Sequence, residues 1–251
     1  MKAQLNGIAI DYEVSGSGPV LLLSHGYGST RHMWDEQHRA LGDRWRVVSW
    51  DMRGHGQSDS PADPAQYSAA LTVADMAALL RHVGAERAII GGLSLGGYVS
   101  LAFALAHPEM TQALVICDSG PGSRNAEARA QWNQRAQERA AGLEAKGLEA
   151  LTRRSKETQQ AVHRSAQGLA HAARGMLAQE GSQVIDGLAT IRVPTLVIVG
   201  DQDQPFVAPS EYMAKKIAGA RLAVIPGAGH SSNLDQPEVF NRVLREFLAG
   251  L

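Results

Sequence analysis

The sequence predicts an α/β fold, with a mainly parallel central sheet that is covered by helices on both faces. Short apolar runs typical of strands alternate along the chain with segments that have helical periodicity. Most of these runs are apolar at every position, which is typical of strands whose two faces are both buried. A length of 251 residues with 44% hydrophobic residues fits one such domain with an insertion.

The expected strands and helices follow one another in a regular order. Residues 3–14 are predicted to form a hairpin around the tight-turn dipeptide Asn6-Gly7. The other expected strands are residues 20–23, 46–51, 88–90, 113–117, 194–200 and 222–225. The expected helices are residues 31–41, 73–83, 98–106, 210–217 and 237–248, with Thr72 as the N-cap of the second.

Residues 121–186 differ in composition from the rest of the chain. They contain no strand-like run and are rich in Ala, Arg, Glu and Gln, which favour helices over a flexible linker. We therefore predict a core domain of residues 1–120 and 187–251, with a helical cap of residues 121–186 inserted into it. Positive charge is in excess in this insertion, whose arginines are Arg124, Arg129, Arg135, Arg139, Arg153, Arg154, Arg164 and Arg174.

The charge and the apolar runs limit the class of partner. A net charge of −1, with no basic block, argues against nucleic acid or an anionic membrane surface as the main partner. The apolar runs are far too short to span a membrane, and no apolar signal segment is visible, so a cytoplasmic location is the expectation. The single cysteine, Cys117, excludes an intramolecular disulfide. Both a monomer and a homodimer fit the sequence.

Residues 88–106 hold the strongest functional motif. An apolar run ends at two glycines and a helical segment begins just past Ser94, so the order is strand, sharp turn, helix. Gly92-Leu93-Ser94-Leu95-Gly96 fits the G-x-S-x-G pattern of a nucleophilic serine in this context. The residues two positions on either side must be small, because strand and helix pass each other closely.

A serine hydroxyl is a weak nucleophile at neutral pH and needs a general base. His230 is the candidate, because its glycine-flanked loop after the last strand can carry an imidazole over the carboxyl ends of the strands. A carboxylate must then hold the histidine in one tautomer. Asp118, Asp201 and Asp203 all follow strand ends and are open candidates at this point.

Several motifs occur in a fixed order along the chain. They are His25-Gly26-Tyr27-Gly28, the loop of residues 51–59, the Ser94 turn, Gly200-Asp201-Gln202-Asp203 and Pro226-Gly227-Ala228-Gly229-His230. On these motifs the chain resembles the α/β-hydrolase fold superfamily from end to end, in which the nucleophile, the acid and the histidine follow in that order. The resemblance implies that fold, with a helical cap inserted into the core.

The resemblance also assigns expected roles. It favours a catalytic triad of Ser94, His230 and Asp203, with Asp201 and Asp118 holding loops. It implies an oxyanion hole made by the backbone N–H groups of Leu95 and Tyr27. It further implies that His25 holds its loop by buried hydrogen bonds, and that Arg53 and His55 are structural.

A serine at the turn predicts acyl transfer to water, since superfamily members that dehalogenate alkyl halides or open epoxides carry an aspartate there. The favoured reaction is hydrolysis of a small carboxylic ester or lactone through an acyl-enzyme on Ser94. A 3-oxoadipate enol-lactonase-type reaction, carbon–carbon bond hydrolysis and thioester hydrolysis are alternatives. A cofactor-free haloperoxidase or perhydrolase, and a ligand receptor of the same fold, also remain open.

The resemblance is strongest to 3-oxoadipate enol-lactonases and small bacterial esterases. The candidate pocket walls are Tyr27, Trp34, Leu95, Trp132, Phe206 and Val207. Trp132 fits equally well as the core anchor of the insertion. Arg124, Arg129 or Arg135 would suit a substrate carboxylate, and a solvated helix face explains them as well. No metal-ligand spacing and no G-x-G-x-x-G turn after the first strand occurs, so we expect no metal and no cofactor.

Overall fold

The structure is a computed structural model that describes residues 1–151 and 156–251. In this part of the chain eight strands form one sheet in the order β1-β2-β4-β3-β5-β6-β7-β8. They are β1 (Lys2–Leu5), β2 (Ile8–Ser15), β3 (Val20–Ser24), β4 (Arg46–Trp50), β5 (Ala88–Leu93), β6 (Thr111–Cys117), β7 (Thr195–Gly200) and β8 (Arg221–Ile225). β2 is antiparallel to β1 and β4, and all other neighbours are parallel, which confirms the predicted sheet type.

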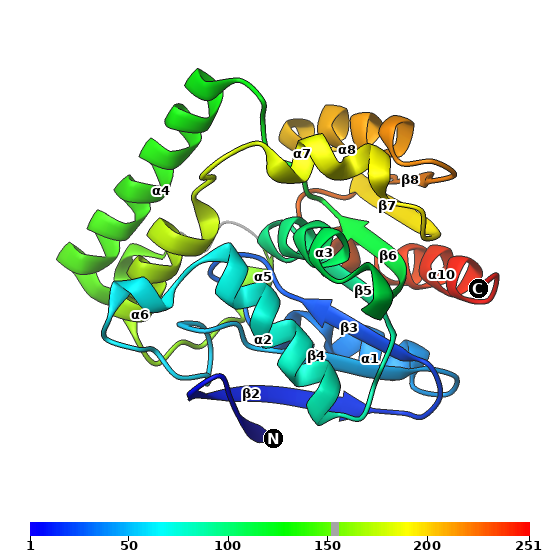
Figure 1. Ribbon diagram of the computed structural model, residues 1–251, viewed down its shortest axis with the longest axis horizontal. Coiled ribbons are helices and arrows are strands. Elements are labelled where there is room, and N and C mark those ends of the chain that lie inside the picture. Colours follow the sequence, from blue (N-terminus) through cyan, green and yellow to red (C-terminus); the bar gives the residue numbers. More distant parts are fainter. Residues whose placement is uncertain (152–155) are drawn as a thin grey trace.

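Helices cover both faces of the sheet (Figure 1). α1 (Asp35–Leu41) and α10 (Pro237–Leu248) pack on one face. α2 (Ala69–His82), α3 (Leu95–Ala106) and α8 (Gln204–Lys216) pack on the other. Successive residues of β3 alternate between these layers, because Leu21 and Leu23 join one apolar cluster and Leu22 joins the other. The two-sided burial explains why the strands are apolar at every position.

The remaining helices of the core are short. They are η1 (Arg31–Trp34), η2 (Pro64–Gln66), η3 (Pro108–Met110), η6 (Leu188–Thr190) and α9 (Ser232–Asp235). No helix in the described part of the chain is long and apolar enough to cross a membrane.

Three predicted helix starts were wrong, and the smallest error is in α3, which begins at Leu95 and not at residue 98. α2 begins four residues earlier than expected, because the extended backbone of Ser68 lets its hydroxyl accept from the N–H of Leu71 at 3.0 Å. Thr72, the predicted N-cap, lies inside the helix, where its hydroxyl donates to the Ser68 carbonyl at 2.8 Å. α8 also begins early, because Pro205 lies in its first turn, where no N–H partner is needed, and Pro209 is accommodated within it.

The described residues between β6 and β7 form helices joined by loops, with no strand among them. It contains α4 (Ala126–Lys146), η4 (Gly147–Ala150), α5 (Lys156–Gln159), α6 (Ala166–Ala172), a π-helical turn η5 (Ala173–Leu177) and α7 (Gln183–Gly187). We use the name cap for residues 121–186; the predicted boundary at residue 186 falls inside α7. Arg153 and Arg154 lie outside the described residues.

The cap helices have a small apolar core of their own. Ala140 and Leu143 of α4 pack against Leu169 and Ala170 of α6. Figure 1 shows α4 and α6 beyond the carboxyl ends of the strands, on the side toward which the arrowheads of β3 and β6 point. In an α/β sheet this is the end at which ligands bind.

Candidate active site

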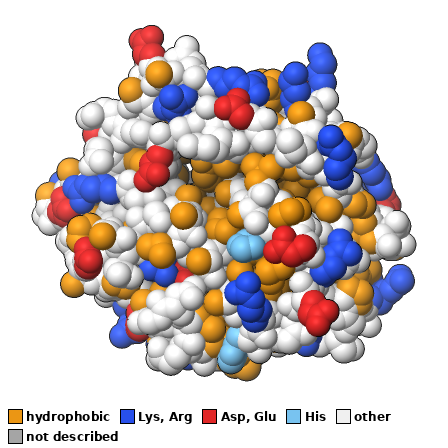
Figure 2. Space-filling view, viewed as in Figure 1, with side chains coloured by type: hydrophobic (Ala, Val, Ile, Leu, Met, Phe, Trp, Pro, Cys, Tyr) orange, Lys and Arg blue, Asp and Glu red, His pale blue; other side chains and the backbone are white. Residues whose placement is uncertain are grey.

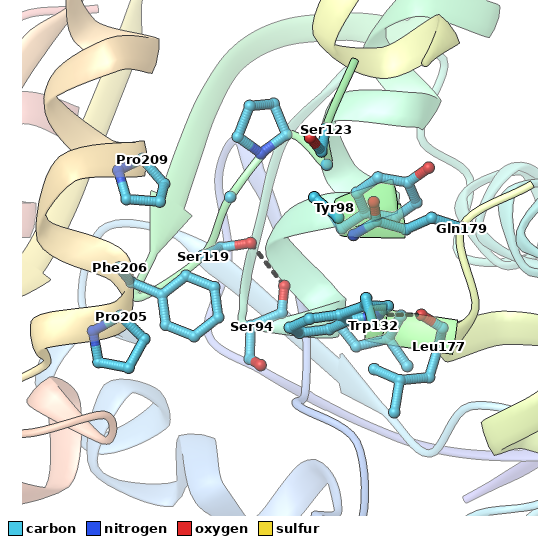
Figure 3. Close-up of a pocket in the computed structure, with 15 residues that line it drawn as sticks. Ser94, Tyr98, Ser119, Ser123, Trp132, Leu177, Gln179, Pro205, Phe206 and Pro209 are labelled. Atoms are coloured by element: carbon cyan, nitrogen blue, oxygen red, sulfur yellow. Dashed lines mark hydrogen bonds between the residues drawn. The ribbon is translucent and has the colours of Figure 1, made fainter. Parts of the chain in front are cut away.

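Ser94 occupies the sharp turn between β5 and α3. Its backbone has φ 56° and ψ −116°, a conformation that residues with a side chain rarely adopt. The turn is fixed by two hydrogen bonds, from the N–H of Ser94 to the Cys117 carbonyl at 3.0 Å and from the Ser119 hydroxyl to the Ser94 carbonyl at 2.6 Å. Figure 3 shows the Ser119–Ser94 hydrogen bond as a dashed line. The serine is therefore held at the end of the sheet by its own backbone.

The two glycines of the motif are required by close backbone contacts. A Cβ added at Gly92 would lie 2.5 Å from the carbonyl carbon of Gly96. A Cβ added at Gly96 would lie 2.1 Å from the carbonyl oxygen of Ser24, at the end of β3. No side chain fits at these distances, so the strand and the helix can pass only with glycine at both positions.

His230 and Asp203 come from the loops after β8 and β7, and they form a direct pair. His230 Nδ1 lies 2.8 Å from Asp203 Oδ2, and the aspartate is only 5% exposed. Phe206, in the first turn of α8, stacks on the imidazole with 5.0 Å between the ring centroids. With Nδ1 bonded to the carboxylate, Nε2 of His230 is the nitrogen that can take a proton.

The charge environment of His230 favours its protonated form. Burial lowers the pKa of His230, but the hydrogen bond and charge of Asp203, with the further charges of Asp118 and Glu157, outweigh this effect. The net result is a pKa above the ordinary value of 6.5. An imidazolium that forms during a reaction is thus stabilised by the carboxylates around it.

Among the described residues, no hydrogen bond joins the Ser94 hydroxyl to His230. Contacts of this kind are often long without a substrate and tighten when one binds. The contact between His230 and Asp203 is thus formed, while none is formed between His230 and the Ser94 hydroxyl.

The other two candidate carboxylates hold the loops that carry the pair. Asp118 accepts from the N–H of Gly200 at 2.8 Å and from the hydroxyl of Ser232, so it joins β6 to the loops of both Asp203 and His230. Burial raises the pKa of Asp118 to about 7. Asp201 accepts from the N–H of Gly227 at 2.9 Å. Neither makes a hydrogen bond to His230, so geometry favours Asp203 as its partner.

The turn of residues 25–28 lies directly against Ser94. A Cβ added at Gly26 would lie 3.4 Å from the Ser94 Cβ. This places the backbone of Tyr27 beside the serine, while Leu95 opens α3 with its N–H at the free end of the helix. The two backbone N–H groups predicted for the oxyanion hole therefore belong to segments that meet at Ser94.

His25 has the buried hydrogen bonds that were expected of it. Its Nε2 accepts from the N–H of Met52 at 3.0 Å, and its Nδ1 donates to the Gly26 carbonyl at 2.7 Å. Burial lowers the pKa of His25 to about 3, so the ring is neutral. Arg53 is buried in an ion pair with Asp75, with Nε 2.7 Å from the carboxylate. Both residues hold loops in place.

A cavity of about 260 Å³ lies over Ser94 (Figure 3). Its walls include Leu95 and Phe206 from the core and Trp132 from the cap, as the sequence suggested. It is lined by Ser94, Leu95, Tyr98, Ser119, Gly120, Pro121, Gly122, Ser123, Ala128, Trp132, Leu177, Gln179, Pro205, Phe206 and Pro209. Figure 2 shows hydrophobic side chains gathered in the hollow on this face.

Three of the expected pocket walls do not line this cavity. Trp34 is fully buried in the opposite layer of the core, where its ring packs against Phe240 at 6.4 Å. Tyr27 turns its side chain toward the cap, and its hydroxyl donates to the Leu169 carbonyl at 2.9 Å. Val207 follows Phe206 on α8, so the helical turn carries its side chain away from the cavity.

The cap arginines that the structure describes do not reach this cavity either. Arg124 pairs with Asp186, and its Nη1 donates to the Tyr212 hydroxyl at 2.7 Å. Arg129 donates to the carbonyl of Ser123 at 2.8 Å. Arg135 lines a separate cavity beside Tyr27. None of the described residues that line the Ser94 cavity carries a charge.

Three residues near the site were not identified from the sequence. Ser119 follows a strand end, a position that could have drawn attention to it. Gln179 lies in a coil between two cap helices and carries no motif. Glu157 of α5 is buried and accepts from the hydroxyl of Ser231, beside His230. The described part of the chain contains no group of three or more His, Cys, Asp or Glu that could hold a metal ion.

The fold and this site define a hydrolase architecture, and comparison with known proteins gives the family. A model described as the alpha/beta hydrolase family matches residues 20–243, and the chain belongs to this family. It is 31% identical to 3-oxoadipate enol-lactonase 2 of Acinetobacter baylyi, over 94% of this chain and 92% of that protein.

Solved structures of hydrolases are also similar to this chain. A thermophilic esterase from Thermogutta terrifontis is similar with a TM-score of 0.85 and 30% identity, over 100% of this chain and 98% of that one. The enol-lactonase from Burkholderia xenovorans LB400 is similar with a TM-score of 0.85 and 27% identity, over 99% of this chain and 100% of that one.

Proposed function

We propose that this protein is a serine hydrolase that cleaves small, uncharged carboxylic esters or lactones through an acyl-enzyme on Ser94. The observation that carries the proposal is the combination of a serine on a strained turn with a histidine–aspartate pair at 2.8 Å. These groups are the nucleophile, the base and the acid that acyl transfer requires. The esterase and enol-lactonase relatives support the same class of reaction.

In the proposed mechanism Ser94 Oγ attacks the substrate carbonyl while Nε2 of His230 takes its proton. The N–H groups of Leu95 and Tyr27 bind the oxyanion of the tetrahedral intermediate. His230 then protonates the leaving alkoxide, and the acyl group stays on Ser94. Water, deprotonated by His230, releases the acid, and Asp203 remains ionised throughout.

The cavity supports a small and neutral substrate. Its volume of about 260 Å³ is below the range of about 300–1,000 Å³ typical of sites for drug-sized ligands. Among the described residues only uncharged ones line the space, so none of them would pair with an ionised carboxylate that lost its hydration there. We therefore rank simple esters and lactones above an enol-lactone that carries a carboxylate, although such lactonases are among the relatives.

The test is a series of initial rates on p-nitrophenyl esters from acetate to decanoate. We expect the highest kcat/KM on acetate to butanoate and a steep fall toward decanoate. Ser94→Ala should lose roughly 10⁴-fold or more in kcat, because triad residues act as a unit. Ser100→Ala is the matched control, since it makes the same change on α3 at a residue outside the cavity.

Two outcomes would reject the proposal. One is equal rates for the wild type and Ser94→Ala on every ester. The other is turnover only of substrates with a carboxylate, which would favour the enol-lactonase-type reaction. A parallel assay with an enol-lactone acid and with its methyl ester separates these cases.

A further inference from the structure

A second cavity lies next to the Ser94 cavity, between α2, α3 and the cap. Its volume is about 510 Å³, which is larger than that of the Ser94 cavity. Small apolar side chains form much of its lining, among them Val73 and Ala74 of α2, Ala102 and Ala106 of α3, and Ala178 of the cap. Walls of this kind favour a hydrocarbon chain over water. We call this space the α2–α3 cavity.

Both cavities lie along the same side of α3. Tyr98 lies one turn beyond Ser94, since its N–H donates to the Ser94 carbonyl at 3.0 Å. Ala102 and Ala106 follow at the same spacing of four residues, which places all of these side chains in one stripe of the helix. Ser94 lines the first cavity, and Ala102 and Ala106 line the second. Tyr98, between them, is the one residue in the described part of the chain that lines both.

A segment of the cap completes the wall between the two cavities. Leu177 and Gln179 line the Ser94 cavity, whereas Ala178 and Glu180 line the α2–α3 cavity. Successive residues of this segment therefore face opposite cavities. The wall consists of this single segment and the side chain of Tyr98, so it is thin.

The Tyr98 ring is the part of this wall that a substitution can remove without changing the backbone. The side chain is half-buried against the apolar core, and Figure 3 shows it at the end of the Ser94 cavity opposite Phe206. Within the described residues, no hydrogen bond holds its hydroxyl. Burial raises the pKa of Tyr98, and so does the negative charge of Glu180 on the far side of the wall. Packing alone thus keeps the ring between the cavities.

We propose that Tyr98 is a specificity residue whose ring ends the Ser94 cavity and restricts the enzyme to short substrates. The inference rests on the proposed function and deepens it by naming the residue that sets the length limit. With the ring in place, a substrate whose carbonyl lies at Ser94 has a cavity of about 260 Å³ for its other atoms. Without the ring, the space continues along α3 into the α2–α3 cavity, where further methylene groups would be buried.

The test compares the chain-length profiles of the wild type and Tyr98→Ala. Two series are used: p-nitrophenyl esters from acetate to decanoate, which vary the acyl part, and alkyl acetates from ethyl to octyl, which vary the alcohol. The measured quantity is the kcat/KM of the eight-carbon member divided by that of the two-carbon member. The series that responds identifies the part of the substrate that faces Tyr98.

This length ratio should rise by about tenfold or more in Tyr98→Ala, in at least one of the two series. Burial of one methylene group contributes roughly fourfold, so about two newly buried groups account for the change. In the wild type the same groups have no apolar space to enter, because the ring ends the cavity.

Three further variants report on the ring through the length ratio. Tyr98→Leu shortens the side chain and keeps its apolar packing, so it should also raise the ratio, and it covers the case in which Tyr98→Ala fails to fold. Tyr98→Phe removes only the hydroxyl and should keep the wild-type ratio, because the ring remains. Tyr212→Ala makes the same change at a half-buried tyrosine that lines neither cavity and should keep the wild-type ratio as well.

A substitution inside the α2–α3 cavity tests where the longer chains go. Ala102 lies one turn beyond Tyr98 and lines only that cavity. Ala102→Phe should leave the length ratio unchanged when Tyr98 is present, and should return it toward the wild-type value in the Tyr98→Ala background. If it had no effect in that background, longer chains would not be entering the α2–α3 cavity, and the inference would be wrong.

An unchanged length ratio in both series for Tyr98→Ala and Tyr98→Leu would overturn the inference, and so would a rise of equal size in Tyr98→Phe. Its failure is distinguishable from failure of the proposed function. If Ser94 cleaves short esters but the Tyr98 variants keep the wild-type ratio, only the role of Tyr98 is rejected. If the wild type cleaves no ester at all, the proposed hydrolase is rejected with it.

Discussion

The core and the cap contribute to the site in different ways. The core supplies the residues of the proposed triad and fixes them through backbone constraints: the Ser94 turn, the glycines around it and the loop that Asp118 holds. The cap supplies walls through Trp132 and Gln179, and none of its described residues that line the cavity carries a charge. The proposed chemistry thus depends on core positions, such as Gly92 and Gly96, that tolerate almost no change.

A few long-range contacts join the two regions. The hydroxyl of Tyr27 reaches the Leu169 carbonyl, and the hydroxyl of Ser29 reaches the Glu157 carbonyl at 3.2 Å. The carboxylate of Glu157 accepts from Ser231. These contacts all involve the turn at residues 25–29 or the loop of His230, so the cap is attached to the segments that carry the proposed oxyanion hole and base.

The largest expected effect comes from breaking the contact between Asp203 and His230. Asp203→Asn should lower kcat by roughly 10⁴-fold at neutral pH, because the amide favours the wrong tautomer of His230. Asp201→Asn changes the same loop without touching His230, so it should keep most of the activity. Rates on p-nitrophenyl butanoate for both variants check this. A greater loss in Asp201→Asn would contradict the assignment.

The next effect concerns stability in the core. Gly96→Ala would place a Cβ 2.1 Å from the Ser24 carbonyl oxygen, and neither the strand nor the helix can move away without losing its packing. We expect a loss of about 3 kcal/mol or more in the free energy of unfolding. Urea denaturation measures it. An unfolding midpoint equal to that of the wild type would show that the turn is looser than the structure indicates.

A smaller effect tests the electrostatic influence of the cap on the base. The negative charge of Glu157 raises the pKa of His230, and the base must be neutral to act. Glu157→Gln should therefore lower that pKa and move the acid limb of the kcat/KM profile to lower pH. Glu149→Gln, an exposed change in η4, is the control. If the acid limb moved to higher pH in Glu157→Gln, the negative charge of Glu157 would not be raising the pKa of His230.

The smallest effect should be a gain in the cap. Gly142 lies inside α4, where an added Cβ would meet only the Ala150 Cβ at an ordinary 3.8 Å. Gly142→Ala should raise the free energy of unfolding by about 0.5–1 kcal/mol, because alanine is the better helix former. The same substitution thus has opposite signs at Gly142 and Gly96. Destabilisation at Gly142 would mean that the cap is as tightly constrained as the core.

The sequence predicted the fold because the fold depends on local patterns. Continuous apolar runs identified the buried strands, and glycines marked the places where backbones approach closely. Ser94, Asp203 and His230 could be proposed as candidates because each follows a strand end, where the topology brings side chains to one edge of the sheet. The start of α2 was misplaced because both Ser68 and Thr72 suit an N-cap position. The start of α8 was placed too late because a proline such as Pro205 is also typical of loops.

The cavity was harder to predict, because no local pattern encodes which way a side chain turns. Trp34 and Trp132 are both large aromatic residues near the motifs, yet one is buried in the opposite layer and the other lines the cavity. Gln179 also lines the cavity, and the sequence could not predict this because a glutamine in a coil carries no signal. These outcomes depend on tertiary packing between segments that are distant in the sequence.

The backbone of Ser94 also limits how the stability of this protein can be raised. Its φ of 56° costs on the order of 1–3 kcal/mol for a residue with a side chain, and glycine at that position would remove the cost together with the hydroxyl. Selection for thermal resistance alone would therefore reward loss of the nucleophile. A durable and active form has to gain its stability elsewhere, and the exposed helices of the cap are where such gains can accumulate without affecting the chemistry.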